Sequence, residues 1–198
     1  MVLENRAARL QPWTVTGPGG VAGAYYDFVS NPELIREKLE DFKPYEDKPA
    51  VQNLYRILED LNRQSGLLET CDCALGPMKN GATMFGKSHN LGGRLEIIIR
   101  DQKVNTELVA VANFIRYLSI YLQKEWPDCD VAWIEIHTLQ TKFTALPNDK
   151  SAGYRTSIVF QVHGDGTDQV WTNLDLTLSA LFKALKRLEQ LLIPKGNG

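Results

Sequence analysis

The residues best suited to acid–base chemistry lie in the last third of the chain. Glu135 and His137 occupy alternate positions of one expected strand, His163 ends the next expected strand, and Asp165 follows two residues later. Successive side chains of a strand point to opposite faces, so Glu135, His137 and His163 should share the outer face of a hairpin. A carboxylate beside an imidazole is the minimum unit of acid–base catalysis, and two imidazoles with a carboxylate can bind a divalent metal. These four residues are the candidates for a small hydrolase or a metal-dependent enzyme.

The expected turn of this hairpin sets which residues face each other. A turn centred near Asp149 would place Glu135 opposite His163 and His137 opposite Gln161, within cross-strand contact. The alternative is a solvated polar face with one favourable cross-strand pair, which is a routine way to stabilise a sheet. We favour this alternative, because no nucleophile in the local sequence completes a triad.

Cysteine chemistry is the second possibility that the sequence raises. Cys71 and Cys73 flank Asp72 on an expected strand, where alternation would place both sulfur atoms on one face. Cys129 or a histidine would then have to complete a zinc site. Free cysteine is also one of the commonest buried small residues, so we favour a packing role and expect neither a metal nor a cofactor. Three cysteines are too few for a disulfide framework, which indicates a reducing compartment.

Two glycine-rich segments could contact anions, but neither carries a specific motif. Gly17-Pro18-Gly19-Gly20 lacks the strand and helix that frame a phosphate loop. The expected loop 76–93 is polar, and its only aromatic residue for base stacking is Phe85. We favour a mobile surface loop there. The basic residues in or beside this loop are Lys79, Lys87, His89 and Arg94.

Composition and charge exclude several classes of protein. The 198 residues include 22 Lys and Arg against 24 Asp and Glu, a net charge of −2, which gives no strong signal for nucleic acid or anionic membrane. No apolar run is long enough to cross a bilayer, and the first residues do not resemble a secretory signal. We therefore expect a cytoplasmic protein, bacterial or viral, or a virion component if the chain is a particle subunit.

An arm of aromatic residues precedes the expected body of the protein. Residues 1–30 contain several glycines and read as irregular, yet aromatic residues are scarce in disordered tails. We expect the arm to dock its aromatic side chains on its own body or on a neighbouring subunit, and to act in self-association or partner binding. The candidate interaction residues are Trp13, Tyr25, Tyr26 and Phe28.

The pattern of apolar residues beyond the arm predicts a single α+β domain over residues 31–198. A helical hairpin is expected over 31–65, and the sheet and its helices over 66–192. The second part reads as two β-β-α units in series, which should form a four-stranded, mainly antiparallel sheet with two long helices on one face. The expected strands are 67–75, 94–100, 131–143 and 154–163, and the expected long helices are 105–126 and 172–192.

These features favour a non-enzymatic assembly or interaction protein. The aromatic arm and an expected central helix with more apolar surface than one sheet face can cover both point to protein partners, either a second copy or neighbouring subunits. A structural subunit of a larger particle, such as a phage-type tail, neck or capsid component, is one form of this hypothesis. The small hydrolase is one alternative, and a monomeric or dimeric inhibitor or adaptor is another.

Overall fold

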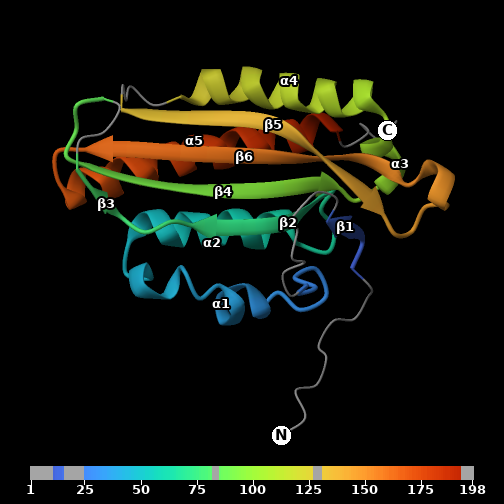
Figure 1. Cartoon of the computed structure of the whole chain (residues 1–198), viewed down its shortest axis with the longest axis horizontal. Coiled ribbons are helices and arrows are strands. Elements are labelled where there is room, and N and C mark those ends of the chain that lie inside the picture. Colours follow the sequence, from blue (N-terminus) through green and yellow to red (C-terminus); the bar gives the residue numbers. More distant parts are fainter. Residues whose placement is uncertain (1–10, 16–24, 82–84, 127–130, 193–198) are drawn as a thin grey trace, which may run out of the picture.

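The chain forms one antiparallel sheet with helices packed on one of its faces (Figure 1). A computed structural model describes residues 11–15, 25–81, 85–126 and 131–192. All strand pairs are antiparallel, and the strand order is β1-β5-β6-β4-β2, with β3 paired to β4. The strands are β1 (Trp13–Val15), β2 (Leu68–Leu75), β3 (Lys79–Asn80), β4 (His89–Ile99), β5 (Ala132–Phe143) and β6 (Ala152–Gly164).

The helices form the second layer. Helices α2, α4 and α5 pack together, and α5 contacts both β4 and β6. In Figure 1, α5 lies behind the centre of the sheet, α4 runs alongside β5, and α2 lies beside β2. None of the helices in the described ranges is long and apolar enough to cross a membrane. The helices are α1 (Leu34–Lys38), α2 (Pro49–Leu61), α3 (Gln102–Thr106), α4 (Leu108–Glu125) and α5 (Thr167–Leu192).

The α+β class and the predominantly antiparallel sheet are therefore predicted correctly, but the four-stranded sheet is wrong. The four long strands form its centre, while β1 extends the sheet beside β5 and β3 pairs with the start of β4. Strand β4 begins at His89, within the segment expected to be a loop, because residues 89–93 pair with the end of β6. Helix α5 begins at Thr167, earlier than the expected start at residue 172.

One core lies between the sheet and the helices. The even-numbered side chains Ile158 and Phe160 of β6 are fully buried against the leucine stripe of α5. Phe160 also explains a glycine in the middle of β4, because a Cβ at Gly93 would lie 2.5 Å from the Phe160 ring. The buried members of the stripe are Leu174, Leu178, Leu181, Leu185 and Leu188, as their spacing predicts.

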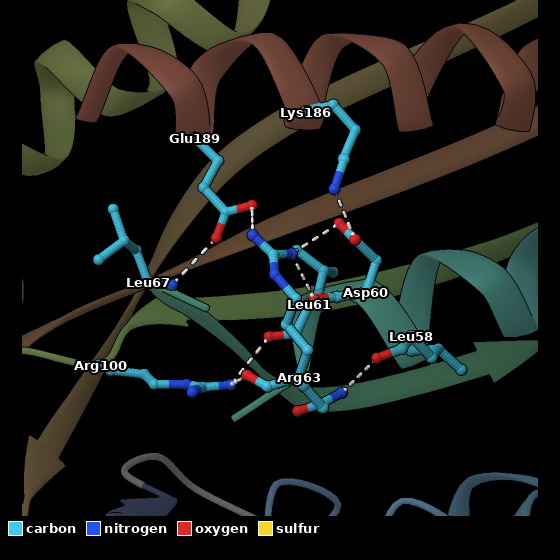
Figure 2. Close-up of polar contacts among 9 residues, drawn as sticks. Leu58, Asp60, Leu61, Arg63, Leu67, Arg100, Lys186 and Glu189 are labelled. Carbon is cyan, nitrogen blue, oxygen red and sulfur yellow. Dashed lines mark hydrogen bonds and ion pairs between the residues drawn. The ribbon is translucent and has the colours of Figure 1, made fainter. Parts of the chain in front are cut away.

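A polar network ties the end of α2 to α5 and to the start of β2 (Figure 2). Arg63, just after α2, binds the buried carboxylate of Glu189 on α5, and the other oxygen of Glu189 accepts the Leu67 amide at 3.0 Å. Lys186 of α5 and Arg63 both contact Asp60, at 2.6 and 3.0 Å. These contacts give the buried carboxylate of Glu189 a guanidinium and a backbone amide as partners, so that its charge is not buried unpaired.

Candidate functional site

The predicted acid–base cluster does not form. In the β5–β6 hairpin Glu135 lies opposite Val159 and His137 lies opposite Ser157, so Glu135 does not face His163. Lys142 pairs with Ala152, which centres the turn near Pro147 instead of Asp149. Moving the centre of a turn by two residues moves the register by four. The shift is even, so the assignment of alternate residues to the two faces still holds.

The four candidate residues have separate environments. Glu135 and His137 face solvent in part, with Nδ1 and Oε1 3.9 Å apart. His163 is buried against the Phe85 ring, and neither of its ring nitrogens has a hydrogen-bond partner among the described residues. Burial lowers the pKa of His163. Asp165 pairs with Lys87 at 2.7 Å. Within the described ranges, no three His, Cys, Asp or Glu side chains are placed to hold a metal ion.

The two described cysteines lie on opposite faces of the sheet. The pairing of β2 with β4 shifts between Thr70 and Asp72, and this bulge interrupts the alternation that would have placed both sulfur atoms on one face. Cys73 packs on the helix side, whereas Cys71 packs with Trp13 on the other side. Burial raises the pKa of both thiols well above the usual value, which keeps them protonated and unreactive. Cys129 lies outside the described residues.

The two glycine-rich segments contribute little to a site. Residues 17–20 lie outside the described residues. In the 76–93 segment, β3 pairs with His89 and Asn90, so much of the expected loop is a short hairpin. The four basic residues there do not gather, because Lys87 binds Asp165 while Arg94 binds Asp72 on the outer face of the sheet.

The four arm aromatics, in contrast, line a single cavity of about 600 Å³ on the outer face of the sheet, which we call the arm cavity. Trp13 belongs to β1 and is 5% exposed, and its ring meets Tyr25 edge to face with centroids 5.4 Å apart. Tyr26 and Phe28 stack at 6.3 Å, and the Tyr26 ring is exposed. The arm therefore docks on its own sheet, with Trp13 packed on Ile98 and Phe143.

Two ion pairs form the polar wall of the arm cavity. Arg155 and Glu96 are both nearly buried, with Nε and Oε2 2.7 Å apart. Burial raises the pKa of Glu96, and the nearby Arg155 opposes that shift without cancelling it. Arg94 and Asp72, 2.7 Å apart, remain about half exposed. Burial is the largest single influence on the pKa of Arg94 and tends to lower it, but the hydrogen bond to Asp72 and the nearby charges of Asp72 and Glu96 together leave the pKa raised.

The arm cavity also reaches the outer edge of the sheet at β2. Side chains cap this edge at two points, where the Thr70 amide donates to Asn62 and the Leu75 amide donates to Asp41. Between these caps, residues 70–73 line the cavity. The Gly76 amide donates to the Gly92 carbonyl of β4. Because the backbone groups of successive residues alternate in direction, those of Cys73, three residues earlier, point away from β4. The cavity thus combines aromatic surface, an accessible arginine–carboxylate pair and a strand edge.

Sequence reasoning found the aromatic side of this cavity and missed the charged side. Arg94 and Glu96 alternate with Leu95 and Ile97, which does predict an outer row of charges on one strand. Their partners Asp72 and Arg155 are distant in sequence, and only the strand order brings them together. No family model, curated protein or solved structure matched the chain in the comparisons with known proteins. The case for function therefore depends on this geometry.

Proposed function

We propose that the protein is a non-enzymatic assembly or interaction protein, and that the arm cavity receives a segment of a partner protein. The observation that carries the proposal is the convergence of Trp13, Tyr25, Tyr26 and Phe28 on one cavity with an exposed Arg94. Aromatic residues and arginine are the residues most enriched in protein interfaces. The partner is a neighbouring subunit of a larger assembly or a second copy, in the cytoplasm or in a virion.

The chemistry of the cavity favours a peptide segment with an apolar anchor and a carboxylate. The rings of Tyr26 and Phe28 offer apolar area, and Tyr26 is accessible from solvent. Arg94 presents a planar guanidinium that can bind a carboxylate through two hydrogen bonds. Because Arg94 is already paired with Asp72, a partner carboxylate would have to share it or displace Asp72.

The alternative of a small hydrolase loses its main support. It needed Glu135 and His163 to be neighbours, and the β5–β6 register separates them. The high pKa of both described thiols also argues against a cysteine nucleophile. An adaptor that acts as a monomer remains within the proposal, and native mass distinguishes it from a particle subunit.

Panning a displayed library of random twelve-residue peptides on the immobilised full chain tests the proposal. We expect selected peptides to carry an apolar anchor and an acidic residue, and to bind Arg94→Ala and Tyr26→Ala variants at least about tenfold more weakly, as interface hot spots do. Lys183→Ala, on the exposed side of α5, is the control and should bind normally. Unchanged affinity for both cavity variants, with normal melting, would refute the arm cavity as the site.

A further inference from the structure

Among the described residues, one edge of the sheet is open along most of its length. Strand β1 pairs only with residues 141–143 of β5, the last three residues of that strand. In the described part of the chain, no strand pairs with the outer edge of β5 from Ala132 to Thr138. The segment 132–138 contains neither the lysine nor the proline that commonly protects an exposed edge.

The hydrogen-bond pattern shows which groups this edge presents. The Phe143 amide bonds to Ser151, and the His163 amide bonds to the Val131 carbonyl, so odd-numbered residues of β5 direct their backbone groups to β6. The Thr144 amide donates instead to Pro12, so even-numbered residues face outward. Ile134, Ile136 and Thr138 therefore present amides and carbonyls at the open edge.

A groove of about 580 Å³ lies between this edge and α4. One wall is formed by Leu122 and Trp126 at the end of α4, and the other by Ile134 and Ile136. Trp133 also lines it, and its buried indole N–H has no hydrogen-bond partner within the described ranges. In Figure 1, α4 runs alongside β5. The groove thus has the features of a vacant strand position, with an open backbone edge and an apolar floor.

We propose that this groove binds an extended segment of a partner protein, which adds to the sheet as a strand beside β5. Strand addition to an open edge is a recurrent mode of peptide recognition, in which backbone bonds supply affinity and alternate side chains supply specificity. Strand β1 already occupies the same position at the other end of β5, so the added strand would continue an existing pairing. The seven open residues match the usual length of a strand.

The side chains of β5 define the chemistry of that segment. Residues that face α4 must be apolar, because they would pack on Ile134, Ile136 and Trp126. On the other face Glu135 is 63% exposed and is the only acidic residue of the open edge. A lysine or arginine opposite Glu135 would make a favourable cross-strand pair. The expected segment therefore alternates apolar residues with polar ones and carries a central basic residue.

A second copy of the chain fits less well. The β5 edge of a second copy would bring its own α4 against the first α4, because that helix flanks the edge (Figure 1).

A library of displayed nine-residue peptides that alternate valine or isoleucine with threonine, lysine or glutamate tests this inference on the full chain. We expect enrichment of peptides with a central lysine. Thr138→Pro removes one outward amide without removing a bond to β6, and should weaken binding about tenfold or more. Glu135→Lys should weaken the binding of peptides with a central lysine and should favour the binding of peptides that carry glutamate at the same position. Gln190→Lys, an exposed change on α5 that also adds a positive charge, is the control for nonspecific charge effects.

The outcomes separate this groove from the arm cavity. Arg94→Ala should leave binding of the alternating peptides unchanged, because the two sites share no lining residue. Failure of the alternating peptides to bind, or equal binding by Thr138→Pro and Glu135→Lys variants that melt normally, would overturn the inference and leave the arm cavity untouched. Sedimentation as a dimer that Thr138→Pro dissociates would also overturn it, by assigning the edge to a second copy.

Discussion

The imidazole of His163 lies against the Phe85 ring, and neither ring nitrogen has a hydrogen-bond partner in the described part of the chain. Burial lowers its pKa below the usual value of about 6.5, so the folded state takes up this proton less readily than the unfolded state. The contribution of neutral His163 to the free energy of unfolding is therefore fully present above about pH 6.5. It is lost as the pH falls through the pKa of His163 in the folded state.

We predict that His163→Phe removes this pH dependence. The phenyl ring fills similar space beside Phe85 but cannot take up a proton. Urea unfolding at several pH values between about 7.5 and 5 should show the wild-type protein losing more free energy than the variant as the pH falls. Gln190→Ala, an exposed change on α5 that alters no titratable group, is the control and should follow the wild-type curve. Parallel curves for wild type and His163→Phe would contradict the assigned cause.

At the scale of elements, the amphipathic pattern of α5 predicts its packing correctly. Its leucine stripe is buried because a helix brings every third or fourth residue to one face, which the sequence alone reveals. The β5–β6 register could not be predicted in the same way. It depends on where an eight-residue turn containing Pro147 and a 3-10 segment over Asn148–Lys150 is centred, and several centres are compatible with the same alternation.

Leu185→Ala tests the packing of α5 directly. Leu185 is 2% exposed in the main core, so the substitution should lower the free energy of unfolding by about 2–5 kcal/mol, as large-to-small core changes do. Leu191→Ala lies on the same helix at a 52% exposed site and should cost less than about 0.5 kcal/mol. Equal losses from the two variants in chemical denaturation would show that the stripe is assigned to the wrong face.

At the scale of the whole molecule, the arm and the sheet together form the proposed binding site. The sequence predicts that the arm docks its aromatic residues, and the structure shows Trp13 docked on the outer face of its own sheet. The sequence could not predict the charged wall of the arm cavity. That wall comes from three strands that only the strand order brings together, and its residues are Arg94, Asp72, Glu96 and Arg155. The three-residue β1 was missed for a related reason, since so short a strand has no periodic pattern.

Deletion of residues 1–24 tests the central claim, that the arm builds the binding site of an interaction protein. Loss of Trp13 should lower the free energy of unfolding by about 3–5 kcal/mol, while the remaining core keeps the melt cooperative. Calorimetric titration with a peptide selected for the arm cavity should show affinity at least about tenfold weaker than for the full chain. A deletion of residues 1–10, which keeps Trp13, is the matched control. If the 1–24 deletion binds the peptide as tightly as the full chain, Trp13 and β1 are no part of the site and the account is contradicted.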